Sequence, residues 1–304
     1  EERTEYAKNR PQRRAAEKAS FKPNTSESLE LQPLQEFSGP VASGAASSQP
    51  FHVNIDNAAW FVMDFHAHLS TCEIIGLLGG TWDATTKSIS IRAAFPCRRA
   101  SGTDSLTSVE LDPEHEVEIR SLMEQQGLRP VGWYHSHPTF APKPSAKDNS
   151  NQHNYQALFR DEASGFEPFV GIIIGPYDIA LPNASSASTV FIVQEKSVGL
   201  LAYNIRYSLT AMELPCEGLE QKVVELLGMF KEDIGRIDFT ELWRPFTTLS
   251  QGATGGGPMT KLAKLRNALV SHLPSEKYSE SEDLLDRCAV AMQKSWGIDL
   301  GFPS

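Results

Sequence analysis

VGWYHSHPTFAPKPSAKD, residues 131–148, is the stretch of sequence on which the prediction of the fold rests. It begins as a short apolar strand, places His135 and His137 one residue apart, and reaches Asp148 after a proline-rich turn. Alternate residues at the end of a strand point to one face, so both imidazoles can reach one metal ion while Ser136 points away. The stretch therefore predicts a metal site formed by His135, His137 and Asp148.

The ligand types indicate zinc in a catalytic setting. Imidazole nitrogen and carboxylate oxygen suit zinc, and three protein ligands leave a fourth position for water, which is typical of catalytic sites. Hydrolysis also needs a group that takes a proton from water and passes it to the leaving amine, and Glu73 is the candidate. The sequence alone does not place Glu73 near the histidines.

Hydrophobic patterns on both sides of the motif predict a mixed α/β core. An opening strand over 51–55 is followed by a helix that Asp56 caps and that runs to about Leu69. A second helix is expected from Pro113, capped by Asp112 and ended by Gly127. Further strands are predicted over 73–80 and 88–95, which form a hairpin around Asp83, and over 131–134, 169–174 and 188–194.

Composition divides the chain into three parts. Residues 1–50 contain the basic stretch Arg10–Arg14 and a Ser/Ala/Gly/Pro-rich tract, so we expect an arm that is disordered or extended over the core. Residues 51–210 form the expected core domain. Residues 211–304 are expected to be a helical extension with helices over about 216–231, 258–273 and 279–296, and with a flexible joint at Gly252–Gly257.

Charge and cysteine content limit the functional classes. A formal net charge of −10 argues against a general nucleic-acid-binding surface, so direct nucleic-acid binding is not expected and protein partners are favoured. The 4 cysteines include no close pair, which argues against both a disulfide framework and a cysteine zinc cluster. No apolar run is long enough to span a bilayer. These features predict an intracellular protein without a membrane partner.

A family resemblance rests on four elements of the sequence. They are Glu73 at the start of EIIGLLGG, the HSHP of residues 135–138, seven residues between His137 and Ser145, and Ser-x-x-Asp ending at Asp148. Together they resemble the JAMM metalloprotease motif of the MPN+ domain family over roughly residues 51–210. The string 131–148 is most similar to MPN domains of histone deubiquitinases that also carry Myb-like and SWIRM domains, and of related MPN domain-containing proteins.

The resemblance implies a fold, a reaction and residue roles. The fold is the MPN mixed sheet of the cytidine deaminase-like type, flanked by helices. One zinc ion with a catalytic water is held by His135, His137 and Asp148, Glu73 is the general acid and base, and Ser145 donates a hydrogen bond to the tetrahedral oxyanion. The implied activity is a zinc-dependent deubiquitinase that cuts the isopeptide bond between ubiquitin and a lysine of a target such as a histone, or of a ubiquitin chain. The alternatives are a non-catalytic MPN scaffold and an isopeptidase for another ubiquitin-like modifier.

Substrate and partners follow from the same resemblance. Ubiquitin or a ubiquitinated protein is the expected partner, gripped by two loops that flank the motif, Cys97–Glu110 and Tyr177–Ala187, although both are also polar enough to be disordered without a partner. The C-terminal helices are expected to pack on the core or to bind partner subunits. The histone deubiquitinase likeness favours a nuclear over a cytoplasmic location.

Simpler interpretations compete at three places. Ser145 and Asp148 also form the pattern of a helix capping box, and both roles can hold together. His66 and His68 lie in a helical pattern, where positions two apart diverge, so we expect residues of the helix surface or the core edge rather than ligands. Cys72, beside Glu73, is interpreted as a core residue rather than a redox sensor.

Overall fold

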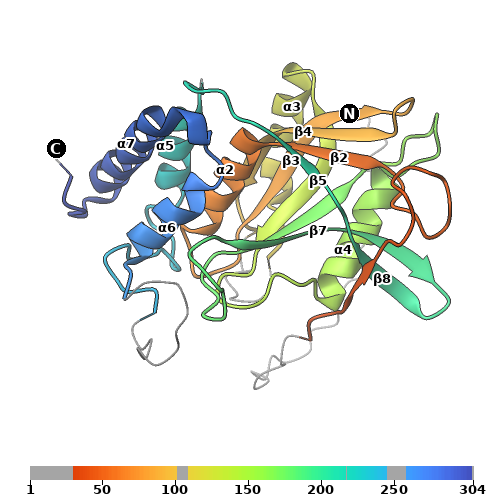
Figure 1. Cartoon of the computed structure of the whole chain (residues 1–304), viewed down its shortest axis with the longest axis horizontal. Helices are drawn as coiled ribbons and strands as arrows, with labels where there is room; N and C mark the ends of the chain where they lie inside the picture. Colours follow the sequence, from red (N-terminus) through yellow and green to blue (C-terminus); the bar gives the residue numbers. More distant parts are fainter. Residues whose placement is uncertain (1–29, 101–108, 217, 245–257, 303–304) are drawn as a thin grey trace.

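A mixed β-sheet with the strand order β1-β8-β7-β6-β5-β3-β4-β2-β9 forms the centre of the molecule (Figure 1). The computed structural model describes residues 30–100, 109–216, 218–244 and 258–302 of the chain, and the strands are counted within them. The sheet mixes parallel pairs, such as β5 with β6, and antiparallel pairs, such as β3 with β5. Its strands are β1 Leu34–Glu36, β2 His52–Asp56, β3 Ile75–Asp83, β4 Ser88–Cys97, β5 Arg129–Ser136, β6 Val170–Gly175, β7 Ala187–Lys196, β8 Gly199–Asn204 and β9 Ser208–Thr210.

Helices cover both faces of the sheet. One apolar core lies between the sheet and α2 together with the C-terminal helices, and it contains Tyr134 and Ile172. The second core lies on the opposite face against α3 and α4, and it contains Trp133 and Ile173, the alternate residues of the same strands. The helices are α2 Asn57–Ala67, α3 Pro113–Gln125, α4 Ala146–Leu158, α5 Leu219–Met229, α6 Lys261–Val270 and α7 Tyr278–Trp296, with a short 3-10 helix at Ser275–Lys277.

The predicted α/β class and the hairpin are confirmed. β3 and β4 pair antiparallel, with Leu77 opposite Phe95 and Asp83 opposite Ser88. Asp112 caps α3 by accepting hydrogen bonds from two backbone N–H groups, as predicted. Asp56 occupies the N-cap position of α2, but its side chain makes no capping hydrogen bond and instead lies 3.5 Å from the Arg92 guanidinium. The predicted N-cap position of Asp56 is therefore confirmed, without a capping hydrogen bond from its side chain.

Close strand packing at the site end of the sheet depends on Gly76. A Cβ atom at Gly76 would lie 2.3 Å from the ring of Tyr134, the residue opposite it on β5. The Tyr134 hydroxyl lies 2.8 Å from His66 Nδ1 on α2, so the aromatic ring crosses from the strand to the helix. A side chain at position 76 would displace that ring, which explains why glycine interrupts an otherwise bulky apolar strand.

Part of the expected N-terminal arm runs along the sheet. Strand β1 pairs in parallel with β8, with Leu34 opposite Ala202. Just before it, the Gln32 N–H donates to the Pro144 carbonyl at 2.7 Å, and Leu31 forms an isolated bridge with Ser145. This part of the arm therefore contacts the proline-rich turn of the motif. The basic stretch Arg10–Arg14 and the expected joint Gly252–Gly257 lie outside the described residues.

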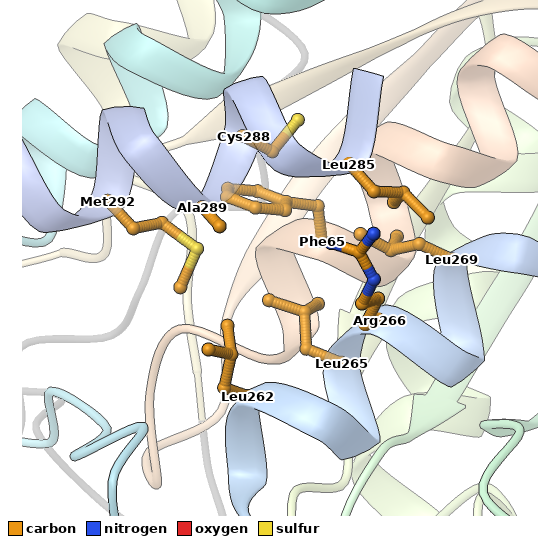
Figure 2. Close-up of a pocket in the computed structure, with 9 residues that line it drawn as sticks. All are labelled: Phe65, Leu262, Leu265, Arg266, Leu269, Leu285, Cys288, Ala289 and Met292. Atoms are coloured by element: carbon orange, nitrogen blue, oxygen red, sulfur yellow. The ribbon is translucent and has the colours of Figure 1, made fainter. Parts of the chain in front are cut away.

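The C-terminal helices pack on α2. Figure 2 shows Phe65 of α2 pointing toward apolar side chains of α6 and α7, around a small apolar gap between the three helices. The Arg266 guanidinium at its side joins α6 to α7, with Glu282 at 2.5 Å and Asp286 at 2.7 Å. The predicted C-terminal helices are thus present: α5 and α6 are shorter at both ends than expected, and α7 matches its expected range to within one residue. Within the described residues, no helix combines the length and apolar character that crossing a membrane requires.

Candidate metal centre

Three potential ligands converge where β5 ends and α4 begins. His135 Nε2 lies 3.2 Å from His137 Nε2 and 3.4 Å from Asp148 Oδ1. His137 Nε2 lies 3.8 Å from Asp148 Oδ2. His135 is in β5, His137 follows its last residue, and Asp148 occupies the first turn of α4. Of the described residues, these three form the one His/Cys/Asp/Glu group whose ligand atoms all lie within 4.8 Å of one another.

The spacing of these atoms fits a tetrahedral zinc ion. Zn–N and Zn–O bonds of about 2.0–2.1 Å put neighbouring ligand atoms of a tetrahedron roughly 3.3 Å apart. The 3.2 Å between the two Nε2 atoms matches that edge, and each Nε2 has an Asp148 oxygen close to it, Oδ1 at 3.4 Å from His135 and Oδ2 at 3.8 Å from His137. All three side chains are nearly inaccessible to solvent, with residue exposures of 1% for each histidine and 8% for Asp148. The donor set and its geometry therefore suit zinc with one position left open.

Neighbouring groups fix the orientation of both imidazoles. His137 Nδ1 lies 3.0 Å from the Ala141 carbonyl, so this nitrogen carries the proton and Nε2 keeps a free lone pair facing the other ligands. The His135 ring is stacked on the Trp133 indole, with centroids 4.7 Å apart and planes 15° apart. Trp133 Nε1 in turn donates to Gln152 Oε1 on α4 at 2.7 Å. The ligand rings are thus held before any ion binds.

Charge interactions within the site oppose the effect of burial. Burial alone would raise the pKa of Asp148, but the two histidines hold that pKa well below its ordinary value. Burial alone would lower the pKa of His135, yet the carboxylates of Asp148 and Glu73 outweigh it and the pKa is raised. The pKa of His137 is lowered, mainly by burial. An anionic Asp148 and a neutral His137 are the protonation states that a metal ligand requires.

Glu73 lies beside the three ligands. Its Oε1 is 4.0 Å from His137 Nε2, and the residue is 4% exposed. Burial raises the pKa of this carboxyl to about 8, an effect that His135 opposes and Asp148 reinforces. A carboxyl group with a pKa near the working pH can both accept and return a proton. The fold therefore places Glu73 next to His135, His137 and Asp148, a proximity that the sequence alone did not reveal.

Ser145 forms the capping box with Asp148. Its hydroxyl accepts from the Asp148 N–H at 3.2 Å and donates to Asp148 Oδ2 at 2.7 Å. The Ser145 N–H also donates to Asp148 Oδ2, at 2.7 Å. The capping interpretation is confirmed, and the same bonds hold the Asp148 carboxylate in place.

Other residues support the site without having been singled out from the sequence. The Ser136 hydroxyl accepts from the Ile74 N–H at 3.0 Å and so ties β5 to the residue after Glu73. The Tyr177 N–H donates to the Pro138 carbonyl at 2.9 Å, and its hydroxyl donates to the His68 carbonyl at 3.0 Å. The prediction that Ser136 points away from the ligands agrees with its bond to Ile74. No pattern in the sequence indicated that Ser136 holds the backbone next to Glu73.

The two expected flanking loops follow β4 and β6. The segment Cys97–Glu110 lies partly outside the described residues, and its two ends are joined by a hydrogen bond from the Ala100 N–H to the Glu110 carbonyl at 2.8 Å. The segment Tyr177–Ala187 leads from β6 to β7, and its Ile179 side chain is 77% exposed.

His66 and His68 are buried, which corrects the expectation of a surface or core-edge position. Each residue is 0% exposed. His66 Nδ1 lies 2.8 Å from the Tyr134 hydroxyl and His68 Nδ1 lies 2.8 Å from the Asp64 carbonyl, so one ring nitrogen of each has a hydrogen-bond partner in the core. Burial lowers the pKa of His66 to about 3, with Arg99 adding to the effect. Cys72 is buried, as its core interpretation requires.

Comparisons with known proteins identify a domain family and its relatives. Residues 48–160 match the family model "JAB1/Mov34/MPN/PAD-1 ubiquitin protease". An "MPN domain-containing protein" of Danio rerio is 30% identical over 235 residues, which covers 75% of this chain and 47% of that protein. A histone deubiquitinase of Branchiostoma floridae, named MYSM1, is 38% identical over 168 residues, covering 55% and 19%. A "Deubiquitinase MYSM1" of Homo sapiens is 32% identical over 197 residues, covering 65% and 22%. The chain thus spans less than half the length of each of these relatives.

Proposed function

We propose that this chain is a zinc-dependent deubiquitinase, because residues 48–160 match the JAB1/Mov34/MPN/PAD-1 ubiquitin protease family. The reaction is hydrolysis of the isopeptide bond between the ubiquitin carboxyl terminus and a lysine amine. The observation that carries the proposal is the convergence of His135, His137 and Asp148 next to the buried carboxyl of Glu73. A scaffold domain needs neither the ligand set nor the base.

In the proposed mechanism, His135, His137 and Asp148 hold zinc, which when bound supplies the Lewis acidity that activates water and polarises the amide carbonyl. The Glu73 carboxylate takes the proton from the attacking water and later gives it to the departing lysine amine. Burial raises the pKa of this carboxyl above its ordinary value, which makes it a stronger base and favours its holding the accepted proton until the amine departs. Ser136 and Ala141 hold the base segment and the His137 ring in position.

Ser145 is proposed to stabilise the oxyanion. Its hydroxyl lies at the edge of the ligand group, where it bonds to Asp148 Oδ2. A donor aimed at developing negative charge contributes about 2.7–4 kcal/mol to lowering a hydrolytic barrier. In this role the hydroxyl turns from Asp148 to the substrate, while the Ser145 N–H keeps its own bond to Asp148.

The substrate assignment follows from the flanking segments and the relatives. We propose that Cys97–Glu110 and Tyr177–Ala187 grip the extended ubiquitin tail, since an extended peptide pairs with exposed backbone beside a strand end. The catalytic domain is proposed to span 51–210, with an arm at 1–50 and the helical extension at 211–304. Two of the relatives above are named as deubiquitinases, one of them as a histone deubiquitinase, so a ubiquitinated histone and a nuclear location are the first choice.

A panel of conjugates tests this proposal. The zinc-loaded and the metal-depleted chain are incubated with monoubiquitinated nucleosomes, defined ubiquitin chains and a NEDD8 conjugate. We expect zinc-dependent release of ubiquitin, fastest from the nucleosome. Release of NEDD8 in preference to ubiquitin would overturn the substrate assignment. Absence of hydrolysis in every arm, with zinc bound, would favour the scaffold alternative.

A further inference from the structure

The backbone that leads into Glu73 is held by a segment of the C-terminal extension. The Thr71 N–H donates to the Gly235 carbonyl at 2.7 Å, and the Ile237 N–H donates to the Leu69 carbonyl at 3.0 Å. Residues 233–237 follow α5 and lie outside the 48–160 region that matches the family model. A part of the chain beyond the metal-site motif thus pairs with the four residues that precede the proposed base.

Asp233 is the centre of this contact. Its Oδ1 accepts a hydrogen bond from the Ser70 hydroxyl at 2.8 Å and another from the Gly235 N–H at 2.8 Å. Its Oδ2 pairs with the guanidinium of Arg99, which lies at the start of the first flanking loop. The two side chains are 9% and 11% exposed, so water competes little for either charge. One carboxylate therefore joins the base segment to the loop that leaves β4.

A short series of hydrogen bonds continues from Asp233 to Glu73. The Ser70 hydroxyl that donates to Asp233 also accepts from the Cys72 N–H at 3.1 Å, and Cys72 directly precedes Glu73. The packing leaves little room for adjustment, because a Cβ atom at Gly235 would lie 2.6 Å from Ser70 Oγ and 2.9 Å from Cys72 Sγ. A shift of residues 233–237 therefore moves Cys72 as well.

The opposite side of Glu73 is held by the core domain. The Ile74 N–H donates to the Ser136 hydroxyl at 3.0 Å, and the Ser136 N–H donates to the Ile74 carbonyl at 3.1 Å. The backbone on both sides of Glu73 is thus held by hydrogen bonds, to β5 after Glu73 and to residues 233–237 before it. If the bonds to residues 233–237 are lost, β5 still holds Ile74, but the Glu73 carboxyl can shift relative to the ligand group.

We propose that Asp233 is a positioning residue for Glu73, setting the distance between its carboxyl and the ligand group through Ser70 and Cys72. The proposal rests on the function proposed above for Glu73. A misplacement of about 1 Å can cost on the order of a hundredfold in rate even when it originates away from the reacting atoms. The C-terminal extension is then part of the catalytic apparatus and not merely a covering for α2.

The test compares Asp233→Ala with Asp238→Ala in the full chain. Asp238 is a matched control, because its carboxylate accepts from the Thr240 N–H two residues on, as Asp233 does from Gly235, but lies on the surface. For Asp233→Ala we expect a kcat at least about tenfold lower on the best ubiquitin conjugate, with KM within about twofold and the zinc content unchanged. Asp238→Ala should match the unmodified chain in all three quantities.

A second variant covers the case in which Asp233→Ala folds poorly. Ser70→Ala removes the bonds to Asp233 and Cys72 but leaves the Asp233 pair with Arg99 intact. It should lower kcat in the same direction. The Ser70→Ala and Asp233→Ala effects on kcat should be less than additive, because both variants break the same connection.

Amide hydrogen exchange separates this inference from the proposed function. Metal-free Asp233→Ala should exchange faster than metal-free Asp238→Ala over residues 69–76, a readout that needs no activity. Equal exchange in the two variants, or an unchanged kcat in a zinc-loaded Asp233→Ala chain, overturns the positioning role even if Asp233→Ala melts at a lower temperature. An unmodified zinc-loaded chain without hydrolytic activity overturns the proposed function instead.

Discussion

The Ser145 hydroxyl donates a hydrogen bond to Asp148 Oδ2 at 2.7 Å while it accepts one from the Asp148 N–H at 3.2 Å. One side chain thus caps α4 and touches a proposed zinc ligand. Loss of a serine cap costs about 1 kcal/mol of stability, whereas loss of an oxyanion donor costs about 10²–10³ in kcat. The two roles therefore predict different measurements for the same substitution.

We expect Ser145→Ala to lower kcat by about 10²–10³ at saturating zinc, with a fall of about 1 kcal/mol in the free energy of unfolding. Thr260→Ala is the matched control, because Thr260 caps α6 through the Ala263 N–H at 3.2 Å, away from the metal centre. It should show the stability loss and a normal kcat. A normal kcat in Ser145→Ala would show that Ser145 caps α4 and does not stabilise the oxyanion.

Glu73→Gln should bind zinc and lose hydrolysis. The amide has nearly the shape of the carboxyl, so the ligand group stays intact, but it cannot take up the proton of the attacking water. We expect kcat to fall by about 10²–10⁴, measured on a ubiquitin isopeptide, with zinc content determined in parallel. Glu124→Gln, on the exposed side of α3, should behave as the unmodified chain does. Retained turnover in zinc-loaded Glu73→Gln would refute the assignment of the base.

Metal removal and thiol modification should have opposite effects. A chelator is expected to abolish hydrolysis, and added zinc to restore it, because His135, His137 and Asp148 supply no nucleophile of their own. Alkylation should leave activity intact, since Cys72, Cys97 and Cys288 are buried and the partly exposed Cys216 belongs to the C-terminal extension. Burial also raises the pKa of the Cys97 and Cys288 thiols to about 12, which keeps them unreactive. Inactivation by a thiol reagent with zinc still bound would indicate a cysteine mechanism.

Sequence patterns predicted those features that depend on nearby residues. The strand-end alternation of His135 and His137 and the spacing to Asp148 predicted that these three side chains converge, and the Ser145-x-x-Asp148 pattern predicted the capping box. The start of α3 followed from Asp112, whose side chain accepts hydrogen bonds two and three residues ahead. Each of these features depends on backbone geometry over a few residues, so the spacing of residue types in the sequence is enough to predict it.

Contacts between segments that are far apart in the sequence could not be predicted from such patterns. The bond between Ser70 and Asp233 joins residues 163 apart, and nothing near either residue signals the other. The three-residue strands β1 and β9 are defined by their partners and carry too few residues for a period to show. His66 was misplaced because residue type suggests exposure, whereas the Tyr134 hydroxyl of β5 gives its Nδ1 a hydrogen-bond partner in the core.

Lys264 provides a prediction on stability and pH. The residue is 0% exposed, and its Nζ has no hydrogen-bond partner among the described residues and lies 5.0 Å from the Trp243 ring centroid. Burial lowers its pKa from 10.5 to about 8, although the charge of Asp64 opposes this and Arg244 adds to it. Holding the protonated amine in this position costs on the order of 3 kcal/mol. Lys264→Met, of similar length, should therefore stabilise the chain at pH 7.

The sign of the pH dependence follows from proton binding. Between about pH 8 and pH 10.5 the folded chain binds fewer protons at Lys264 than the unfolded chain does, so the unmodified protein gains stability as pH rises through that window. The advantage of Lys264→Met, up to about 3 kcal/mol at pH 7, should shrink by pH 10 in denaturant unfolding. Lys261 is on the same helix as Lys264 and pairs with the exposed Glu241, so Lys261→Met should bring no gain. An advantage for Lys264→Met that is absent at pH 7, or equal at pH 7 and pH 10, would show that the buried amine carries no such cost.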